Sequence, residues 1–290
     1  MDSVKIGVIG GSGLYNMPGL TEIEDREIAT PFGSPSGAVR IGTLAGMRVA
    51  FIARHGKGHV LTPTEVPYRA NIYALKTLGV QQVISISAMG SLREALAPGH
   101  VVIPDQLVDF TRDGRPSSFF GEGLVSHISV ADPFCTELSG IIAEAVTAAG
   151  GTVHRGGTAV TVAGPRFSTR GESALFRKWG CDLIGMTAAP EAFLAREAEM
   201  CYATMAHITD YDVWHESEEA VTVDRVLQTL NANVTLAQNA LIGAVGLLGT
   251  GIDNDCDCHH ALETALITAR ERIPAETLER LRPLVGKYLS

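Results

Sequence analysis

Two aspartates follow an apolar stretch late in the chain, and their spacing indicates chemistry. The run MCYATMA has the small, apolar composition of a buried strand, and HITDYDVW follows it at residues 207–214. Asp210 and Asp212 alternate with Tyr211, so in an extended backbone both carboxylates point to the same side. Two like charges held side by side are costly unless a ligand uses them. The pattern favours a functional site over the alternative of two solvated carboxylates on a surface loop.

A second set of polar residues lies where other predicted strands end. Ser12 lies in the Gly-Ser-Gly turn after the first apolar strand. Arg54 and His55 follow a second strand, and Ser87 ends the run QVISIS. A guanidinium presents a fork of donors that suits phosphate, hydroxyls and turn amides also bind anions, and ligands of open α/β sheets collect at strand ends. Together these residues predict an anion site, although each alone is equally compatible with a structural or solvated residue.

Three further residues are weaker candidates. Phe167 lies in AGPRFSTRGES, a turn in which a phenylalanine either fills the core or stacks on a ligand. Met186 and Thr187, in GMTAAPE, separate a predicted strand from a helix start, where threonine serves more often as a cap than as a ligand. These three residues become candidates for ligand contacts only in combination with the polar residues at the strand ends described above.

The N-terminal motif GVIGGSGL does not fit a dinucleotide-binding site. That site requires a helix directly after the glycines and an acidic residue at the end of the next strand. Here Asn16, Pro18 and Gly19 interrupt any helix, and the segment that follows is rich in turn residues. We therefore expect the glycine turn to present backbone N–H groups and the Ser12 hydroxyl to an anion.

Strand and helix patterns alternate along the chain, which is typical of an α/β fold with a mostly parallel or mixed sheet. Segment 38–54 predicts a hairpin that turns at Ala45-Gly46. No repeat, low-complexity tract or linker is visible, so we predict one domain over residues 1–290, ending in a loop and a helical tail from about 250. The other predicted strands are 4–10, 82–91, 100–103, 158–163, 182–185 and 200–206, and the predicted helices are 65–79, 133–149, 170–180, 190–200 and 221–247.

The composition is that of a globular protein with an acidic surface. The 290 residues are 46% apolar, which allows a sizeable core, and 32 acidic against 23 basic residues give a net charge of −9. Nucleic acids and anionic membranes require basic surfaces, so we expect neither as a partner. The N-terminus enters a strand without a signal sequence, and no apolar run approaches the ~20 residues of a membrane helix. We expect a cytoplasmic protein.

The cysteine pattern gives no clear framework. The chain has five cysteines, an odd number with three isolated members, which is a poor match to a secreted disulfide scaffold. The segment CDCHH (256–260) resembles a metal site, but zinc ligands are usually separated by at least two residues and number four. We therefore predict no metal, and interpret Cys256 and Cys258 as a redox-sensitive pair or as two thiols near a tail.

Taken in order, the motifs over residues 4–245 resemble the 5′-methylthioadenosine phosphorylases of the trimeric purine nucleoside phosphorylase family. The resemblance is carried by IGGSGL, ARHGKGH, VPYRANIYALKTLG, GSLREALAPGHVVIPDQLVDFT, AGPRFSTRGES, DLIGMTAAPEAFLAREAEMCYA and TDYDVWHESEEAVTVDRVL. It implies a three-layer α/β/α phosphorylase/hydrolase-like fold with a central mixed sheet. It also implies phosphorolysis of methylthioadenosine with phosphate as co-substrate and no cofactor, in a homotrimer or homohexamer.

The resemblance assigns roles to individual residues. The aspartates would bind the purine, with a shared proton for N7 and an acceptor for the 6-amino group. Met186 would contact the ribose and Phe167 the purine ring, while His127 would reach the 5′ group from a neighbouring subunit. The implied phosphate shell is Ser12, Arg54, His55, Ser87, Ala88 and Thr187, and the implied seat of the methylthio group is Val223 and Val226.

The sequence departs from the family pattern at a few positions and leaves alternatives open. Ser12 and Ser87 stand where many relatives carry threonine, Pro67 where asparagine is common, and Ala163 where glutamate is common. The nearest alternative is a phosphorylase of 6-oxopurine nucleosides or methylthioinosine. A hydrolytic nucleosidase, which needs no phosphate, and a catalytically silent nucleoside-binding protein are the others.

Overall fold

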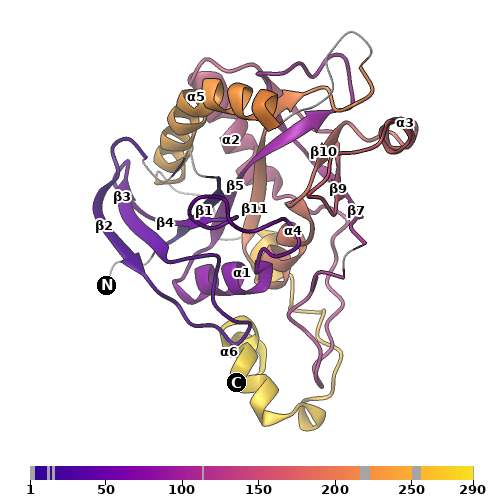
Figure 1. Cartoon of the computed structure of the whole chain (residues 1–290). Helices are drawn as coiled ribbons and strands as arrows, with labels where there is room; N and C mark the ends of the chain where they lie inside the picture. The colour runs from indigo at the N-terminus through magenta and orange to yellow at the C-terminus, as the bar shows by residue number, and fades with distance from the viewer. Residues whose placement is uncertain are drawn as a thin grey trace.

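A central mixed sheet with helices on both faces organises the protein (Figure 1). The computed structural model describes residues 4–11, 14, 17–112, 114–215, 223–249 and 256–289, with backbone alone at 223, 225–227 and 230–232. Among the described residues, none of the helices combines the length and apolarity needed to cross a membrane.

The sheet contains eleven strands among the described residues, and its centre is parallel. β1 pairs in parallel with β4 and β5, and β5 pairs in parallel with β11. Antiparallel pairs extend the sheet at β2, β3 and β4 on one side and join β6 to β11 on the other. The strands are β1 (Ile6–Gly10), β2 (Thr21–Arg26), β3 (Val39–Leu44), β4 (Met47–Ala53), β5 (Gln82–Ser91), β6 (Val101–Ile103), β7 (Gln106–Phe110), β8 (Val153–Arg155), β9 (Thr158–Val162), β10 (Leu183–Gly185) and β11 (Cys201–Asp210).

Two groups of helices cover the sheet. α2 and α5 pack on each other and on β11 at one face, while α1 and α4 pack together at the other face, where α6 joins them (Figure 1). Each group closes one large apolar cluster against the sheet, so the three-layer arrangement follows from two separate cores. The helices are α1 (Tyr68–Thr77), α2 (Thr136–Ala148), α3 (Arg170–Lys178), α4 (Ala188–Glu197), α5 (Val223–Gly249) and α6 (Ala275–Leu289), with 3₁₀ turns η2 (Asp257–His260) and η3 (Arg270–Arg272).

Most predicted elements are confirmed, and the differences have physical reasons. The hairpin of β3 and β4 turns at Ala45 and Gly46, both with positive φ. Pro67 lies immediately before α1, and Pro190 begins the regular part of α4 because Ala189 is extended. Three strands were missed: β2, β7 and β8. β2 is almost fully exposed and charged, so its pairing with β3 leaves no apolar alternation in the sequence.

The last strand is longer than predicted, which changes the geometry of the aspartates. β11 continues four residues past the apolar run and ends at Asp210, with every residue buried. Asp212 then has φ 51°, so the backbone turns after Asp210. The expectation that both side chains share one side of an extended strand is therefore wrong. A turn, and not strand alternation, sets the position of Asp212.

His207 gives β11 a pH-dependent stability. Its side chain is 1% exposed, neither ring nitrogen has a hydrogen-bond partner among the described residues, and burial lowers the pKa to about 4 from 6.5. As pH falls from 6.5 to 4, only the unfolded chain gains this proton, so the folded protein loses stability, by up to roughly 3 kcal/mol. We expect His207→Leu to flatten the pH dependence of the urea midpoint in this window. The exposed-residue control His127→Gln should leave it unchanged, and an equal slope in all three proteins would contradict the assignment.

Candidate active site

The predicted strand ends meet in one cavity of about 550 Å³. β1, β4, β5 and β11 run in parallel, so their carboxyl ends lie at the same edge of the sheet. The side chains come from these ends, from β10 and from the loop before α3. The lining residues are Gly11, Arg54, His55, His59, Pro63, Ser87, Ala88, Met89, Gly90, Val162, Pro165, Phe167, Ser168, Ile184, Gly185, Met186, Thr187, Thr209, Asp210 and Asp212.

The two aspartates form a buried pair in the lining. Asp210 Oδ1 accepts a hydrogen bond of 2.8 Å from the Asp212 amide, and its Oδ2 accepts one of 2.7 Å from the Thr209 hydroxyl. Gly90 lies against the pair, since a Cβ there would come within 2.9 Å of Asp210 Oδ1. The neighbouring backbone and hydroxyl thus fix the Asp210 carboxyl in one orientation.

The surroundings of Asp212 favour its protonated form. Burial raises its pKa, and the charge of Asp210 acts in the same direction. The Ser173 hydroxyl lies near the carboxyl without forming a well-aligned hydrogen bond, and Oδ2 has no partner among the described residues. Because neighbouring carboxyls titrate together, the pair can carry one shared proton and still present an acceptor.

Two hydroxyls line the cavity without hydrogen-bond partners within the described part of the chain. Ser87 is 8% exposed, and its buried Oγ is unsatisfied there. Thr187 is the N-cap residue of α4, but its side chain makes no capping bond. A buried polar atom without a partner is costly, so these hydroxyls are free to bind a polar ligand. Ala88 brings the backbone of β5 to the same wall.

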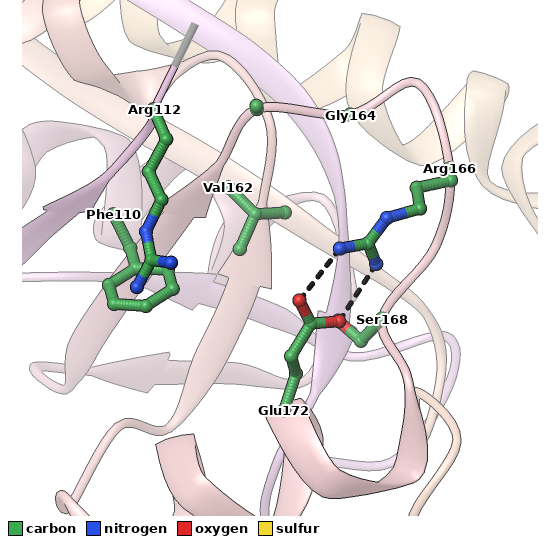
Figure 2. Close-up of a pocket in the computed structure, with 8 residues that line it drawn as sticks. Phe110, Arg112, Val162, Gly164, Arg166, Ser168 and Glu172 are labelled. Atoms are coloured by element: carbon green, nitrogen blue, oxygen red, sulfur yellow. Dashed lines mark hydrogen bonds and ion pairs between the residues drawn. The ribbon is translucent and has the colours of Figure 1, made fainter.

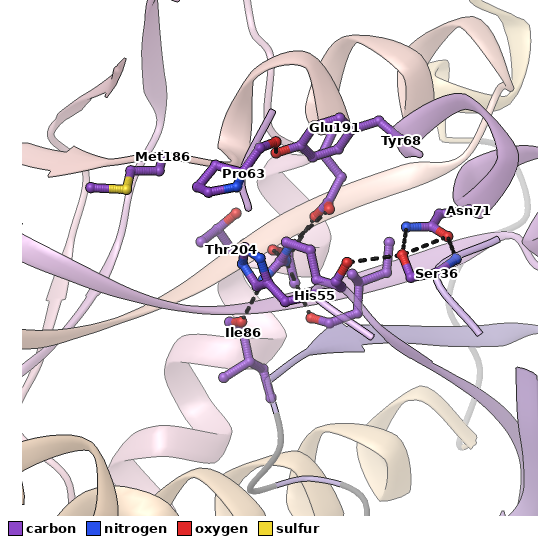
Figure 3. Close-up of polar contacts among 12 residues, drawn as sticks. Ser36, His55, Pro63, Tyr68, Asn71, Ile86, Met186, Glu191 and Thr204 are labelled. Atoms are coloured by element: carbon purple, nitrogen blue, oxygen red, sulfur yellow. Dashed lines mark hydrogen bonds and ion pairs between the residues drawn. The ribbon is translucent and has the colours of Figure 1, made fainter. Parts of the chain in front are cut away.

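Arg54 differs from the sequence prediction, because its guanidinium is already paired. Its Nε and Nη2 donate to the two oxygens of Glu191 at 2.8 and 2.9 Å, and the pair is 3% and 1% exposed. Figure 3 shows Glu191 among the polar contacts of this region. Further bonds reach the Ser85 hydroxyl and the Ile86 carbonyl. Burial lowers the pKa of Arg54, but Glu191 outweighs it and the pKa stays above its usual value. The fork thus binds Glu191, and a phosphate gains mainly the positive charge and one remaining Nη1–H.

His55 is also held in a defined state. Burial and the charge of Arg54 lower its pKa to about 4, so the ring is neutral near pH 7. Nδ1 lies 2.9 Å from the Leu61 carbonyl, which can only accept, so Nδ1 carries the proton. The remaining Nε2 is then an acceptor. The neutral ring therefore has no second N–H to donate to an anion, and it can accept from a protonated oxygen.

Two charged residues that support this site were missed by the sequence reading. Glu191 lies in the first turn of α4, where an acidic residue is common, so nothing in the local sequence indicated that it is buried against a partner. Arg115 donates from Nη1 to the Met186 carbonyl and from Nη2 to the Ala163 carbonyl, both at 2.9 Å. It thereby fixes the backbone of Met186 beside the cavity. Nothing in the sequence around Arg115 marks this role, because the acceptors are backbone carbonyls of distant segments.

A smaller pocket of about 150 Å³ adjoins the cavity and shares Val162 and Ser168 with it (Figure 2). Arg166 forms two hydrogen bonds to Glu172, and the guanidinium of Arg112 lies 4.2 Å from the centre of the Phe110 ring. Both cations therefore have partners already. This pocket forms a rim beside the Phe167 loop and offers no second anion site.

The remaining predicted residues fall into two groups. Phe167 and Met186 line the cavity as expected. Ser12 and the side chains of Val223 and Val226 lie outside the described residues, although the strand before Ser12 leads to the cavity. His127 is exposed on a loop whose backbone bonds Ala265, and it does not line the cavity of its own chain. Its contribution to a neighbouring subunit stays a prediction.

Comparison with known proteins identifies the family of the chain and agrees with the fold. Residues 5–245 match the phosphorylase superfamily. The chain is 54% identical to the S-methyl-5′-thioadenosine phosphorylase of Chloroflexus aurantiacus, with full coverage of both, and 51% identical to that of Geobacter sulfurreducens over 98% of this chain and 99% of the relative.

Solved structures give the same result. A methylthioadenosine phosphorylase from an antarctic soil metagenomic library is 49% identical with a TM-score of 0.93, covering 98% of this chain and 99% of that one. The Schistosoma mansoni enzyme in complex with adenine is 38% identical with a TM-score of 0.82, over 86% and 93%. The chain therefore belongs to the phosphorylase superfamily, within the family of S-methyl-5′-thioadenosine phosphorylases.

Proposed function

We propose that the chain cleaves 5′-methylthioadenosine with inorganic phosphate, giving adenine and 5-methylthioribose 1-phosphate, in the cavity at the strand ends. The observation that carries this proposal is the set of groups that line that cavity. The Ser87 and Thr187 hydroxyls, the cation of Arg54 and the carboxyl pair of Asp210 and Asp212 all belong to its lining. An N-glycosidic phosphorolysis needs these two kinds of group on opposite sides of the bond that breaks.

The phosphate would be held by Ser87, Thr187 and the charge of Arg54, with Ser12 and the Ala88 backbone as further proposed contacts. The neutral His55 accepts the hydrogen of HPO₄²⁻ at Nε2, which leaves the other phosphate oxygens charged. One of these attacks C1′ of the ribose as the C1′–N9 bond breaks. Positioning the nucleophile in this way removes much of the entropic barrier.

The electron pair of the broken bond moves into the purine, and the aspartate pair neutralises the resulting negative charge. The shared proton passes to N7, and the other carboxyl oxygens accept from the 6-amino group. Met186, whose backbone Arg115 fixes, would contact the ribose, and Phe167 would cover the base; both residues line the cavity. The neutral adenine and the sugar phosphate then leave.

Phosphate dependence is the experiment that tests this function. We expect adenine release from methylthioadenosine to require phosphate, with methylthioribose 1-phosphate formed in equal amount. Turnover without phosphate would identify a hydrolytic nucleosidase, and absence of turnover with all of methylthioadenosine, adenosine, methylthioinosine and inosine would identify a silent binding protein. A preference for the two 6-oxopurine nucleosides would favour the alternative phosphorylase.

Selectivity at the 5′ position follows from the proposed apolar seat. Val223 and Val226 offer no hydrogen-bonding atoms. A 5′-hydroxyl placed there loses its water contacts, which costs roughly 1–3 kcal/mol. We expect kcat/KM for methylthioadenosine to exceed that for adenosine by about tenfold or more at saturating phosphate. The variant Val226→Thr should bring the kcat/KM values for the two nucleosides closer together. Equal kcat/KM values for both nucleosides in the wild-type enzyme would show that the 5′ group contacts water.

We also infer a cytoplasmic homotrimer or homohexamer whose neighbouring subunit supplies His127. Support comes from the exposed position of His127 away from the cavity of its own chain and from the acidic composition. Sedimentation equilibrium measures the assembly. If His127→Ala leaves kcat/KM for methylthioadenosine unchanged in an intact oligomer, the residue has no part in the site.

A further inference from the structure

Four of the five cysteines lie together at the opposite edge of the sheet from the cavity. Cys135 immediately precedes α2, Cys201 begins β11, and Cys256 and Cys258 belong to the segment around η2. All four are buried, and their sulfur atoms lie within 4.8 Å of one another. Since Cys201 and Asp210 are the two ends of one strand, about 30 Å separates this cluster from the aspartate pair.

The spacing of the sulfurs suits a tetrahedral metal ion. A zinc ion binds thiolate sulfur at about 2.3 Å, so the sulfurs of a regular four-thiolate site lie about 3.8 Å apart. The Sγ atoms of Cys135 and Cys256 are 3.8 Å apart. All five cysteines have free thiols, so no disulfide consumes the cluster.

The surroundings of the cluster suit thiolates. Arg196 donates from Nη1 to Cys258 Sγ at 3.4 Å and so places a positive charge beside the sulfurs. The backbone amides of Leu138 and Cys258 lie near the sulfurs of Cys135 and Cys256. Such N–H donors orient metal-bound thiolates and reduce their charge. A site with four thiolates and a divalent ion carries two net negative charges, which these groups partly offset.

We propose that Cys135, Cys201, Cys256 and Cys258 bind one zinc ion as four thiolates, in a structural site that fastens the C-terminal segment to the sheet. On binding, four thiols release four protons and no electron is transferred. Four protein ligands leave no open position for a substrate, so the site has no catalytic role.

The positions of the four cysteines show which parts of the chain the ion would connect. Cys135 and Cys201 belong to the sheet and its α2 layer, whereas Cys256 and Cys258 begin the segment that continues through η3 to α6. That segment otherwise contacts the rest of the protein through bonds such as Lys287 to Glu199 and Tyr73 to the Arg280 carbonyl. The sequence prediction of no metal considered only the spacing inside CDCHH, and the structure adds the two missing ligands from elsewhere in the chain.

The test uses untagged full-length protein purified under reducing conditions. We expect about one zinc per chain by plasma mass spectrometry. Exchange for Co²⁺ should give the strong visible absorption of a tetrahedral cobalt site with thiolate ligands. Cys258→Ser and Cys135→Ser should lose most of the bound zinc. Cys181→Ser should keep it, because Cys181 is the buried cysteine outside the cluster.

Three results would overturn the proposal. The first is reduced wild-type protein that takes up no zinc and shows no cobalt spectrum, and this result does not depend on whether any variant folds. The second is zinc content unchanged in both Cys135→Ser and Cys258→Ser. The third is peptide mapping without reductant that finds disulfides among the four cysteines in protein purified in the absence of oxygen.

Discussion

Asp210→Asn is expected to lower methylthioadenosine phosphorolysis by about two to four powers of ten, the usual contribution of general acid help. The amide keeps the shape of the side chain and its acceptor for the Asp212 amide or the Thr209 hydroxyl. It cannot hold the shared proton that N7 needs. With methylthioinosine the new NH₂ group can donate to the 6-oxo group, so this activity should fall less or rise. Steady-state kcat/KM with both substrates measures the difference.

The matched control is Asp212→Asn, with a pH profile of each variant. Because burial and Asp210 raise the pKa of Asp212, the pair keeps a proton to higher pH than a solvated carboxyl. Wild-type kcat/KM should therefore decrease as pH rises through the pKa of the pair, and each variant should lose this limb. A uniform loss on both substrates with Asp210→Asn, at unchanged pH dependence, would make Asp210 a structural residue and leave base recognition to Asp212.

Arg54→Ala is expected to lower the free energy of unfolding by roughly 3–5 kcal/mol, because it leaves the carboxylate of Glu191 buried without its partner. It should also raise the phosphate KM of the folded fraction more than the nucleoside KM, since the cation beside the phosphate is lost. The double variant Arg54→Met with Glu191→Leu removes both charges and should recover much of the stability but not the phosphate affinity. Urea unfolding and initial-rate kinetics separate the two effects.

A surface ion pair provides the control for this experiment. Arg40 makes a similar bidentate contact with Asp25, with two hydrogen bonds of 2.8 Å. In this pair, however, the two side chains are 26% and 49% exposed. Arg40→Ala should cost only about 0–1 kcal/mol. If Arg54→Ala were no more destabilising than Arg40→Ala, the buried pair would contribute no more to stability than a surface pair. If the phosphate KM of Arg54→Ala stayed at the wild-type value, Arg54 would have no part in phosphate binding.

Local sequence patterns predicted much of this protein, and they failed where contacts between distant segments decide the structure. The hairpin of β3 and β4, the strand β5 and the helix α1 carry turn residues or periodicity that operate within a few residues. The exposed strand β2 carries no such signal, because long-range pairing with β3 forms it. Similarly, the end of β11 was placed too early, since the buried positions of His207 and Thr209 depend on neighbouring strands.

The sequence by itself predicted most of the polar residues that meet in the cavity, because their types and their places after apolar strands are those expected for binding phosphate and a purine. It could not determine their states. Only the tertiary structure shows that the fork of Arg54 is bound to Glu191, 137 residues away, and that the neutral His55 is an acceptor. The four cysteines are the clearest case: CDCHH lacks ligands when read alone, and packing of α2 and β11 brings in Cys135 and Cys201. The burial of a side chain, its ion pairs and its place in a metal site depend on contacts between distant segments. These contacts cannot be read from the local sequence.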